Sequence, residues 1–242
     1  MPDALPGSPT PRHPLAAQAA RLVFVHGSGR AGAAAFPAQA AAFPSAQFPV
    51  LAGYGGEAPA VGDVAASAQA VALASTGADG VVGFSYGGVV AAMAACMEPP
   101  AALVLIEPAL FQLSSDRPAT ARLIERLEPI YLDTSLTDAT FERALVRALT
   151  GQDMGAAATA EALRSSRRSR LHGAPWRHAV DTGCLSETRT LVLTGAWNDE
   201  YEEVAEALVE LGAEHAVLPG HGHRVLDHPD CSERIRAFVD AA

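Results

Sequence analysis

Short, mostly apolar runs recur along the chain, and each ends at a turn that contains glycine or proline. These runs occupy 22–26, 48–51, 81–84, 102–106, 190–194 and 214–218. Runs of this length without strict alternation are typical of strands in a parallel sheet that is buried on both faces. Stretches whose apolar residues recur with helical spacing lie between or after these runs, notably over 61–75, after Ser85 and over 231–241. The pattern therefore predicts an α/β fold with a mostly parallel, doubly wound sheet and right-handed crossovers.

The alternation of strands and helices breaks between about 110 and 187. This stretch shows helical periodicity, as in Leu123, Leu127 and Ile130, but no convincing buried strand. The first twenty residues carry five prolines and no uninterrupted apolar core of signal-peptide length. We therefore expect an irregular N-terminal arm over 1–20. A single α/β domain should follow over 21–242, with a helical insertion at about 110–187.

Composition narrows the class of protein. The chain has 242 residues, enough for one sizeable core, and a formal net charge of −10. An acidic balance argues against a nucleic-acid surface, and no window approaches the roughly twenty apolar residues that a membrane helix needs. The three cysteines lie far apart in the sequence. They favour reduced thiols in a soluble cytoplasmic protein over a disulfide framework.

The most informative motif is G-x-S-x-G, formed by Gly83, Ser85 and Gly87. A β-branched run precedes it and a helical stretch of small residues follows it. A serine at a sharp turn from strand to helix has a strained backbone, and glycines on either side leave room for the turn to close. Its hydroxyl then stands above the sheet at the positive end of the next helix. This context favours a nucleophile over an ordinary turn.

Two further motifs follow other predicted strands. A His-Gly-x-Gly loop, 26–29, comes after the first strand, and its glycines allow a backbone amide to face a reacting centre. An acidic stretch, 196–200, follows the strand at 190–194, and a loop with two histidines, 219–223, follows the last strand. Nucleophile, acid and histidine occur in that order, each at the C-terminal end of a strand. From about 21 to 239 the sequence resembles the α/β-hydrolase family, whose fold places a helical cap in the position of the 110–187 insertion.

The resemblance assigns roles to particular residues. Ser85 is the expected nucleophile and His223 the expected base, with His221 as its competitor because both histidines follow a glycine. The backbone N–H groups of Ser28 and Tyr86 are expected to form the oxyanion hole. A serine at the elbow argues against the haloalkane dehalogenases, which resemble this fold but use aspartate there.

The acid of the triad has two candidates. Asp199 follows the strand at 190–194, although the family acid more often stands one residue earlier, where this chain has Asn198. Glu107 ends the preceding strand, and some members of the fold take their acid from that place. The motif position favours Asp199.

The expected activity is cleavage of a carboxylic ester or thioester through an acyl-enzyme. One alternative is a carbon–carbon bond hydrolase or lyase that uses the same triad. Another is a catalytically idle protein of this fold that only binds a ligand. No cofactor is expected. The His-x-His pair lacks compact metal-ligand spacing, so no metal site is expected either. The expected partner is a small-molecule ester or acyl substrate, with neither a nucleic acid nor a membrane, and the oligomeric state stays open.

An arginine-rich part of the insertion bears on the substrate. It contains Arg164, Arg167, Arg168, Arg170 and Arg177. Guanidinium groups bind carboxylate and phosphate, so an acyl group on a phosphopantetheine carrier is one hypothesis. A solvated helix face paired with nearby acids is the favoured interpretation, because charge runs are usually surface features.

Overall fold

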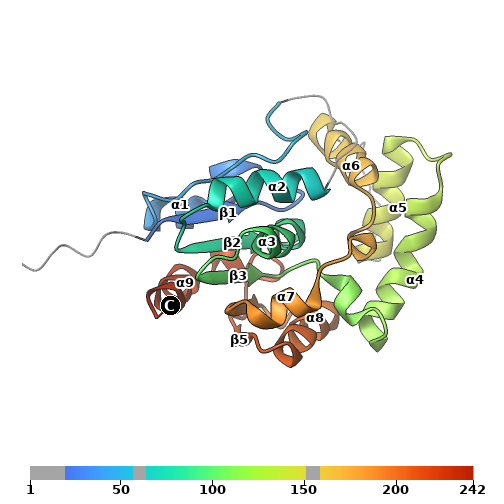
Figure 1. The fold of residues 1–242 in the computed structure, drawn as a ribbon. Coiled ribbons are helices and arrows are strands. Elements are labelled where there is room, and N and C mark those ends of the chain that lie inside the picture. Colours follow the sequence, from blue (N-terminus) through green and yellow to red (C-terminus); the bar gives the residue numbers. More distant parts are fainter. Residues whose placement is uncertain (1–19, 57–63, 151–158, 242) are drawn as a thin grey trace, which may run out of the picture.

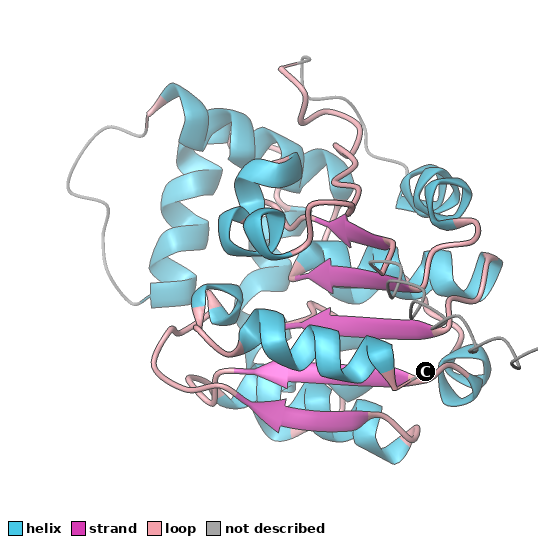
Figure 2. Ribbon diagram, turned by 90° about the vertical axis from the view of Figure 1, so that its left-hand side faces the viewer, coloured by secondary structure: helices cyan, strands magenta, loops and turns pink. Residues whose placement is uncertain are grey.

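A computed structural model describes residues 20–56, 64–150 and 159–241. Its centre is a five-stranded parallel sheet in the order β1-β2-β3-β4-β5, drawn in Figure 2 as arrows that all point the same way. The strands are β1 (Leu22–Val25), β2 (Gly80–Phe84), β3 (Ala102–Ile106), β4 (Thr190–Thr194) and β5 (Glu214–Val217). The predicted α/β fold with a mostly parallel sheet is thus confirmed.

Alternate side chains of β1 to β4 enter two separate layers of the core. The odd-numbered residues Val23, Val81 and Leu103 pack with helices α2 (Val64–Ser75), α3 (Tyr86–Met97) and α8 (Asp199–Glu210). The even-numbered residues Phe24, Val82 and Val104 pack on the opposite face, against α9 (Cys231–Asp240) and residues beside α1 (Pro37–Ala42). Because the strands follow one another across the sheet in one direction, right-handed crossovers bring α2, α3 and α8 to the same face. Figure 1 shows this layering.

The run at 48–51 does not form the expected strand. The chain makes a single parallel bridge between Val23 and Gln47, closed by the Phe24 N–H to Gln47 carbonyl bond of 2.9 Å and the Gln47 N–H to Leu22 carbonyl bond of 2.8 Å. Pro49 follows two residues later and has no N–H to donate to a ladder. The pairing with β1 therefore stops after one bridge.

Helices fill the stretch between β3 and β4, as its periodicity predicts. They are α4 (Pro118–Leu132), α5 (Asp138–Thr150), α6 (Ala160–His172) and α7 (Thr182–Glu187). Figure 1 shows α4, α5 and α6 gathered at one end of the sheet. Short 3-10 turns complete the described chain: η1 (Gly32–Ala35), η2 (Phe111–Ser114), η3 (Pro175–Arg177) and η4 (Val225–Asp227). The predicted N-terminal arm falls, except for Ala20, outside the described residues.

The cysteines correct one expectation. Cys96, near the end of α3, and Cys184, in α7, form a disulfide with their Cα atoms 5.7 Å apart. Cys231 is free and buried. The prediction of three reduced thiols was wrong because a sequence separation of 88 does not show that α3 and α7 are in contact. The cysteines therefore no longer argue for a reducing compartment.

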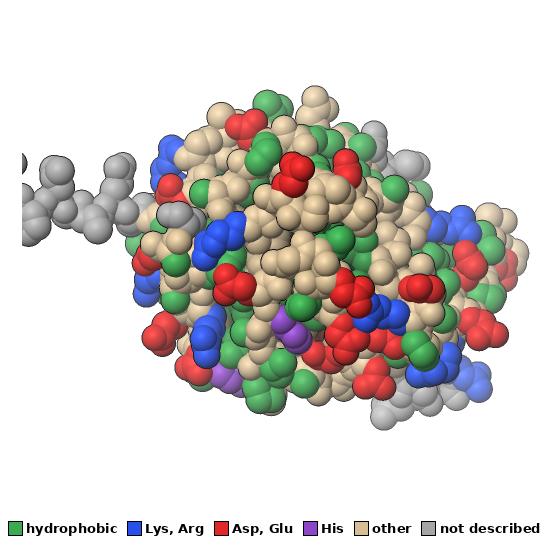
Figure 3. Space-filling model, turned by 60° about the horizontal axis from the view of Figure 1, so that its bottom comes forward, with side chains coloured by type: hydrophobic (Ala, Val, Ile, Leu, Met, Phe, Trp, Pro, Cys, Tyr) green, Lys and Arg blue, Asp and Glu red, His purple; other side chains and the backbone are tan. Residues whose placement is uncertain are grey.

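The molecular surface carries both signs of charge. Figure 3, which views the molecule from the side of α7 and α8, shows acidic and basic side chains interspersed. On α8, Glu206 and Glu210 both pair with Arg117, each at 2.7 Å. Among the described helices, none has the length and apolar character that crossing a membrane would require.

Candidate active site

Ser85 lies at the sharp turn between β2 and α3, as its motif predicts. Its backbone has φ 54° and ψ −122°, and residues other than glycine rarely adopt such a positive φ. A Cβ on Gly83 would lie 2.7 Å from the Ala91 Cβ, and a Cβ on Gly87 would overlap the carbonyl oxygens of Val25 and His26. Both glycines are therefore required for the turn to pack against α3 and β1.

The His-Gly loop after β1 lies directly against Ser85. A Cβ on Gly27 would come within 2.9 Å of the Ser85 Cβ. His26 is fully buried and anchors the loop, because its Nδ1 donates to the Gly27 carbonyl at 2.8 Å and its Nε2 accepts from the Leu51 N–H at 3.1 Å. Burial lowers the pKa of His26, which favours the neutral ring that this pair of bonds requires. His26 thus has a structural place, and the loop brings Ser28 to the edge of the site.

Of the two histidines in the 219–223 loop, His223 is the one that reaches Ser85. Its Nε2 lies 3.0 Å from the Ser85 Oγ. The ring also packs on Phe84, with the ring centroids 5.0 Å apart. His221 is exposed, and its ring lies against His228 instead. The structure thus places the two candidates in different surroundings and brings only His223 to the serine.

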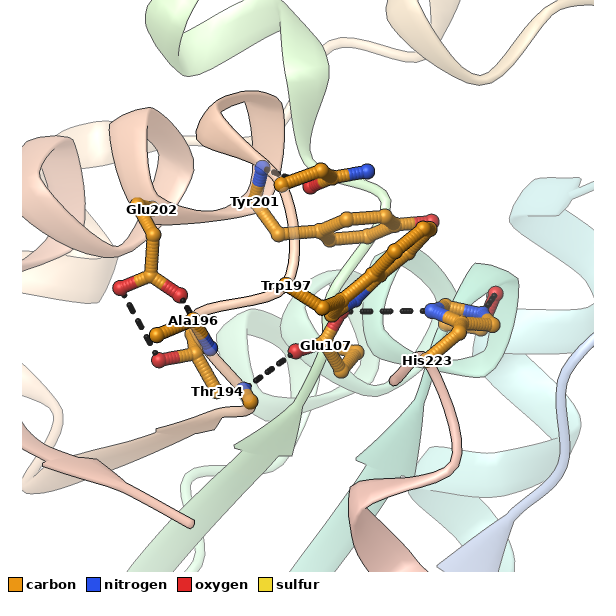
Figure 4. A network of polar contacts seen from close by, with 10 residues as sticks. Glu107, Thr194, Ala196, Trp197, Tyr201, Glu202 and His223 are labelled. Carbon is orange, nitrogen blue, oxygen red and sulfur yellow. Dashed lines mark hydrogen bonds and ion pairs between the residues drawn. The ribbon is translucent and has the colours of Figure 1, made fainter. Parts of the chain in front are cut away.

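The carboxylate behind His223 belongs to Glu107 and not to Asp199. Glu107 is the residue after β3, and its Oε2 lies 3.3 Å from the His223 Nδ1 (Figure 4). Its side chain is completely buried. Asp199 is exposed at the first residue of α8. The sequence-based preference for Asp199 is therefore corrected, because residues 195–198 turn the chain into α8 before it reaches Asp199.

The Glu107 carboxylate has two further donors, both from the segment that follows β4. The Gly195 N–H donates to Oε1 at 2.7 Å, and the Trp197 Nε1–H donates to Oε2 at 2.7 Å. Sequence reasoning missed Trp197, since an indole donor has no motif of its own. The residue between these donors, Ala196, has a left-handed φ of 48°.

Backbone strain is concentrated around this site. Within the described residues, the non-glycine residues with positive φ are Ser85, Glu107 and Ala196. They follow β2, β3 and β4, three neighbouring strands of the sheet. Such conformations cost of the order of 1–3 kcal/mol each and persist where the surrounding structure enforces them, often at functional sites. The strain therefore marks the same sheet edge as the hydrogen bonds do.

Tyr201 of α8 covers the side of this group. Its ring centroid lies 4.9 Å from that of His223 and 5.9 Å from that of Trp197, and Figure 4 shows it extending across the group toward His223. Burial, and then the neighbouring Glu107 charge, raise the pKa of Tyr201. The phenol therefore stays protonated next to the Ser85 side chain, with which it interacts.

A cavity of about 540 Å³ opens over Ser85 and His223. Its lining also includes Ser28 and Tyr86, the two residues expected to supply oxyanion-hole amides. The wall away from the sheet is largely apolar and comes from the helices of the insertion and from η3. It includes Leu123, Leu127, Leu145, Leu149 and Trp176. The volume lies in the range of sites for small organic ligands.

A small polar recess adjoins the main cavity near Ser28 and Tyr86, which line both. The Tyr86 hydroxyl and the His172 Nδ1 lie 3.1 Å apart in its wall. Burial raises the pKa of Tyr86 and lowers that of His172. Both side chains are therefore neutral near pH 7, and the recess is a hydrogen-bonding surface without a carboxylate among its lining residues.

The arginine-rich segment is paired with acids. Arg164 and Arg168 contact Glu161 at 2.9 and 3.2 Å, and Arg167 and Arg170 contact Asp138 at 3.7 and 2.8 Å. Arg177 contacts Glu128 at 2.8 Å. Each of these five guanidinium groups thus has a carboxylate partner within the protein, as the favoured interpretation expected, but Arg168 is buried and does not lie on a solvated face.

Comparison with known proteins agrees with this architecture. Residues 22–230 match the sequence model of the alpha/beta hydrolase family. No curated protein matches the sequence. Among solved structures, MenH from S. aureus is 17% identical with a TM-score of 0.58, and the match covers 93% of this chain and 94% of that one.

Two other solved structures are similar to the same extent. NosK from Streptomyces actuosus is 23% identical with a TM-score of 0.58, over 93% of this chain and 99% of that chain. A variant of the meta-cleavage product hydrolase CumD is 19% identical with a TM-score of 0.60, over 93% of this chain and 92% of that chain. At these identities the likeness extends to the fold alone.

Proposed function

Because this chain belongs to the alpha/beta hydrolase family, we propose that it is a serine hydrolase that cleaves a carboxylic ester or thioester through an acyl-enzyme. Ser85 is the nucleophile, His223 the general base and Glu107 the acid. One observation carries the proposal: the Ser85 Oγ, the imidazole of His223 and the buried Glu107 carboxylate form a continuous chain of contacts of 3.0 and 3.3 Å. A binding protein would need no base behind its serine.

The geometry supports the following sequence of proton transfers. The Glu107 carboxylate accepts from the His223 Nδ1–H, which leaves Nε2 free to accept the Ser85 proton as Oγ attacks the acyl carbon. The imidazolium then protonates the leaving alcohol or thiol. In the second half-reaction His223 takes a proton from water, the hydroxide attacks the acyl-enzyme, and the Ser85 Oγ regains a proton when it leaves.

The negative oxygen of each tetrahedral intermediate needs donors. The backbone N–H groups of Tyr86 and Ser28 are the proposed donors, because both residues line the cavity beside Ser85. Each such donor is typically worth about 3 kcal/mol of transition-state stabilisation. The strained Ser85 backbone and the anchored His26 loop hold the two segments in place before substrate arrives.

The cavity supports an apolar group of moderate size on the substrate. Its outer wall of leucines and Trp176 favours burial of an acyl chain or an aromatic ring, at about 25 cal/mol per Å² of apolar surface. We assign α4, α5 and α6 to a helical cap over the site for the same reason. The paired arginines of the cap offer no support for an acyl carrier.

The test is a panel of p-nitrophenyl esters and acyl-thioesters of graded chain length, together with labelling by a fluorophosphonate. The wild-type protein should hydrolyse esters of intermediate chain length, and the label should map to Ser85. Ser85→Ala should lose the label, and its kcat/KM should fall by about 10⁴-fold or more. Full activity in Ser85→Ala, or labelling at another serine, would contradict the triad.

A pair of histidine variants provides the matched control. His223→Ala should lower kcat as severely as Ser85→Ala does, because the two residues act as a unit. His221→Ala should retain turnover, since its exposed ring lies on His228. If wild-type protein reacts with the fluorophosphonate but hydrolyses no ester or thioester, a carbon–carbon substrate becomes the better hypothesis. If it does neither, the protein is an idle binder.

A further inference from the structure

One oxygen of the Glu107 carboxylate is shared by two donors. Oε2 accepts from the Trp197 indole N–H at 2.7 Å and contacts the His223 Nδ1 at 3.3 Å. The other oxygen, Oε1, accepts from the Gly195 N–H at 2.7 Å. The indole contact is therefore shorter than the contact to the histidine. Figure 4 shows the indole edge and the imidazole directed at the same carboxylate.

The segment after β4 is built to present these donors. Ala196 adopts a left-handed φ of 48°, which lets both Gly195 and Trp197, on either side of it, reach Glu107. The Ala196 N–H is tied in turn to the Glu202 Oε1 at 3.0 Å. Glu107 itself is fully buried, so water does not solvate its charge and protein donors must do so. The Trp197 indole N–H is thus one of the protein donors that replace water around the buried Glu107 carboxylate.

A donor that binds a carboxylate takes up part of its negative charge. The carboxylate is then a weaker partner for a second cation at the same oxygen. We propose that Trp197 is a positioning residue whose indole N–H orients the Glu107 Oε2 and weakens its attraction for the protonated His223, so that the histidine stays neutral and able to act as a base at lower pH. This inference rests on the proposed serine hydrolase function.

The other groups around His223 do not supply this effect. Phe84 is apolar, and the Tyr201 phenol is neutral. Two charged side chains, Arg126 and Glu200, also line the cavity, but they pair with each other at 3.6 Å.

Two other titratable groups lie on the loop that carries His223, and each has a partner of its own. Arg224 is bound to Asp227 at 2.6 Å, and His221 lies on His228. Glu107 is therefore the charge in direct contact with the imidazole, and Trp197 acts on that charge.

The test is Trp197→Phe, measured as kcat/KM against pH with a p-nitrophenyl ester. Trp197 is 47% exposed, so phenylalanine removes the N–H with little loss of packing. The acid limb should move to higher pH by about half a unit to one unit. Relative to wild type, activity should then fall about three- to tenfold at pH values below the midpoint and much less on the alkaline plateau.

The chain offers a matched control. Trp176 is the other of its two tryptophans. It lines the same cavity, and its indole nitrogen has no hydrogen-bond partner among the described residues. Trp176→Phe makes the same chemical change in the same cavity, and its acid limb should stay at the wild-type position even if KM changes. A shift of equal size in both variants would overturn the proposal.

Trp197→Phe itself has two outcomes that would overturn the proposal. One is an equal loss at every pH, which a merely structural role would give, and the other is a shift of the limb to lower pH. An NMR titration of the His223 ring, assigned with His223→Gln, gives a readout that needs no substrate. Its midpoint should rise in Trp197→Phe, and an unchanged midpoint would refute the inference. If wild-type protein proves inactive, the titration still decides the role of Trp197, whereas the proposed hydrolase function fails by itself.

Discussion

The ends of β3 and β4 lie side by side in the sheet, with Ile106 paired to Leu193, yet they use acidic residues in opposite ways. Glu107 directly follows β3, is fully buried, and is held by two donors besides the histidine. Asp199 comes five residues after β4 and is exposed. An acid near the right strand end is therefore insufficient. The acid that serves the histidine is the one whose carboxylate the fold removes from water.

The second acid has a different physical setting. Asp199 opens α8, and the first turn of that helix also contains Glu200 and Glu202. Negative side chains at the start of a helix are stabilised by the unpaired N–H groups and the positive end of the helix dipole. Asp199 is therefore placed to stabilise α8, whereas Glu107 is placed to contact His223.

Removing the charge of Glu107 should have the largest effect. Glu107→Gln should lower kcat/KM by about 10³- to 10⁴-fold, because an amide in the acid's place favours the wrong tautomer of the histidine. Asp199→Asn, the same chemical change on the neighbouring segment, should alter kcat/KM by less than about threefold. Both are measured with the best ester of the panel. If Asp199→Asn proved the more damaging change, the acid would be assigned to the β4 segment after all.

A smaller effect is expected from the segment that holds Glu107. A Cβ on Gly195 would lie 2.8 Å from the Gly222 carbonyl oxygen and 3.0 Å from the Val225 Cγ2. Gly195→Ala must therefore displace either its own N–H donor to Glu107 or the loop that carries His223. We expect kcat/KM to fall by about 10- to 100-fold, since small displacements of catalytic groups are costly.

The control for this change is Gly55→Ala. A Cβ there meets only Val50, at an ordinary contact distance of 3.6 Å, and the variant should retain the wild-type rate. Wild-type kcat/KM in a folded Gly195→Ala protein, checked by circular dichroism, would show that the site does not depend on this close approach.

The smallest effects concern α8 and should appear in stability instead of catalysis. Asn198 caps this helix by accepting from the Tyr201 N–H at 3.2 Å. Asn198→Ala should lower the free energy of unfolding by about 1 kcal/mol, and Asp199→Asn by about 0.3–1 kcal/mol. Urea denaturation measures both. The control is Asp240→Asn. Asp240 is the last residue of α9, where the helix dipole does not stabilise a negative charge, so this variant should not lower the free energy of unfolding. An unchanged free energy of unfolding in Asp199→Asn would contradict the proposed stabilisation of α8 by this acid.

Local chemistry made part of the molecule predictable. Strands β1 to β4 follow from runs of consecutive apolar residues, because a strand that is covered on both faces has no polar side to alternate, whereas β5 is a largely exposed edge strand. The turn at Ser85 follows from its two glycines, since no other residue fits where α3 meets β1 and β2. Each of these features can be recognised from a few adjacent residues in the sequence.

Other features depended on segments that are distant in the sequence. The run at 48–51 is apolar enough for a strand, but pairing with β1 ends at Gln47, which makes a single bridge to Val23 just before the run. Cys96 and Cys184 form a disulfide across 88 residues because α3 and α7 pack together. The disulfide is not encoded in the local pattern around either cysteine, whereas Pro49 lies within the run whose pairing it ends.

The site divides in the same way, and the division has one physical reason. The serine turn, the histidine loop and the strands that carry them could be recognised in the sequence, because glycine spacing and apolar runs are properties of a single segment. Contacts between distant segments distinguish Glu107 from Asp199 and His223 from His221, and they bring Trp197 to the carboxylate. A charge is stabilised by whichever donors surround it in space, and those donors come from several strands at once.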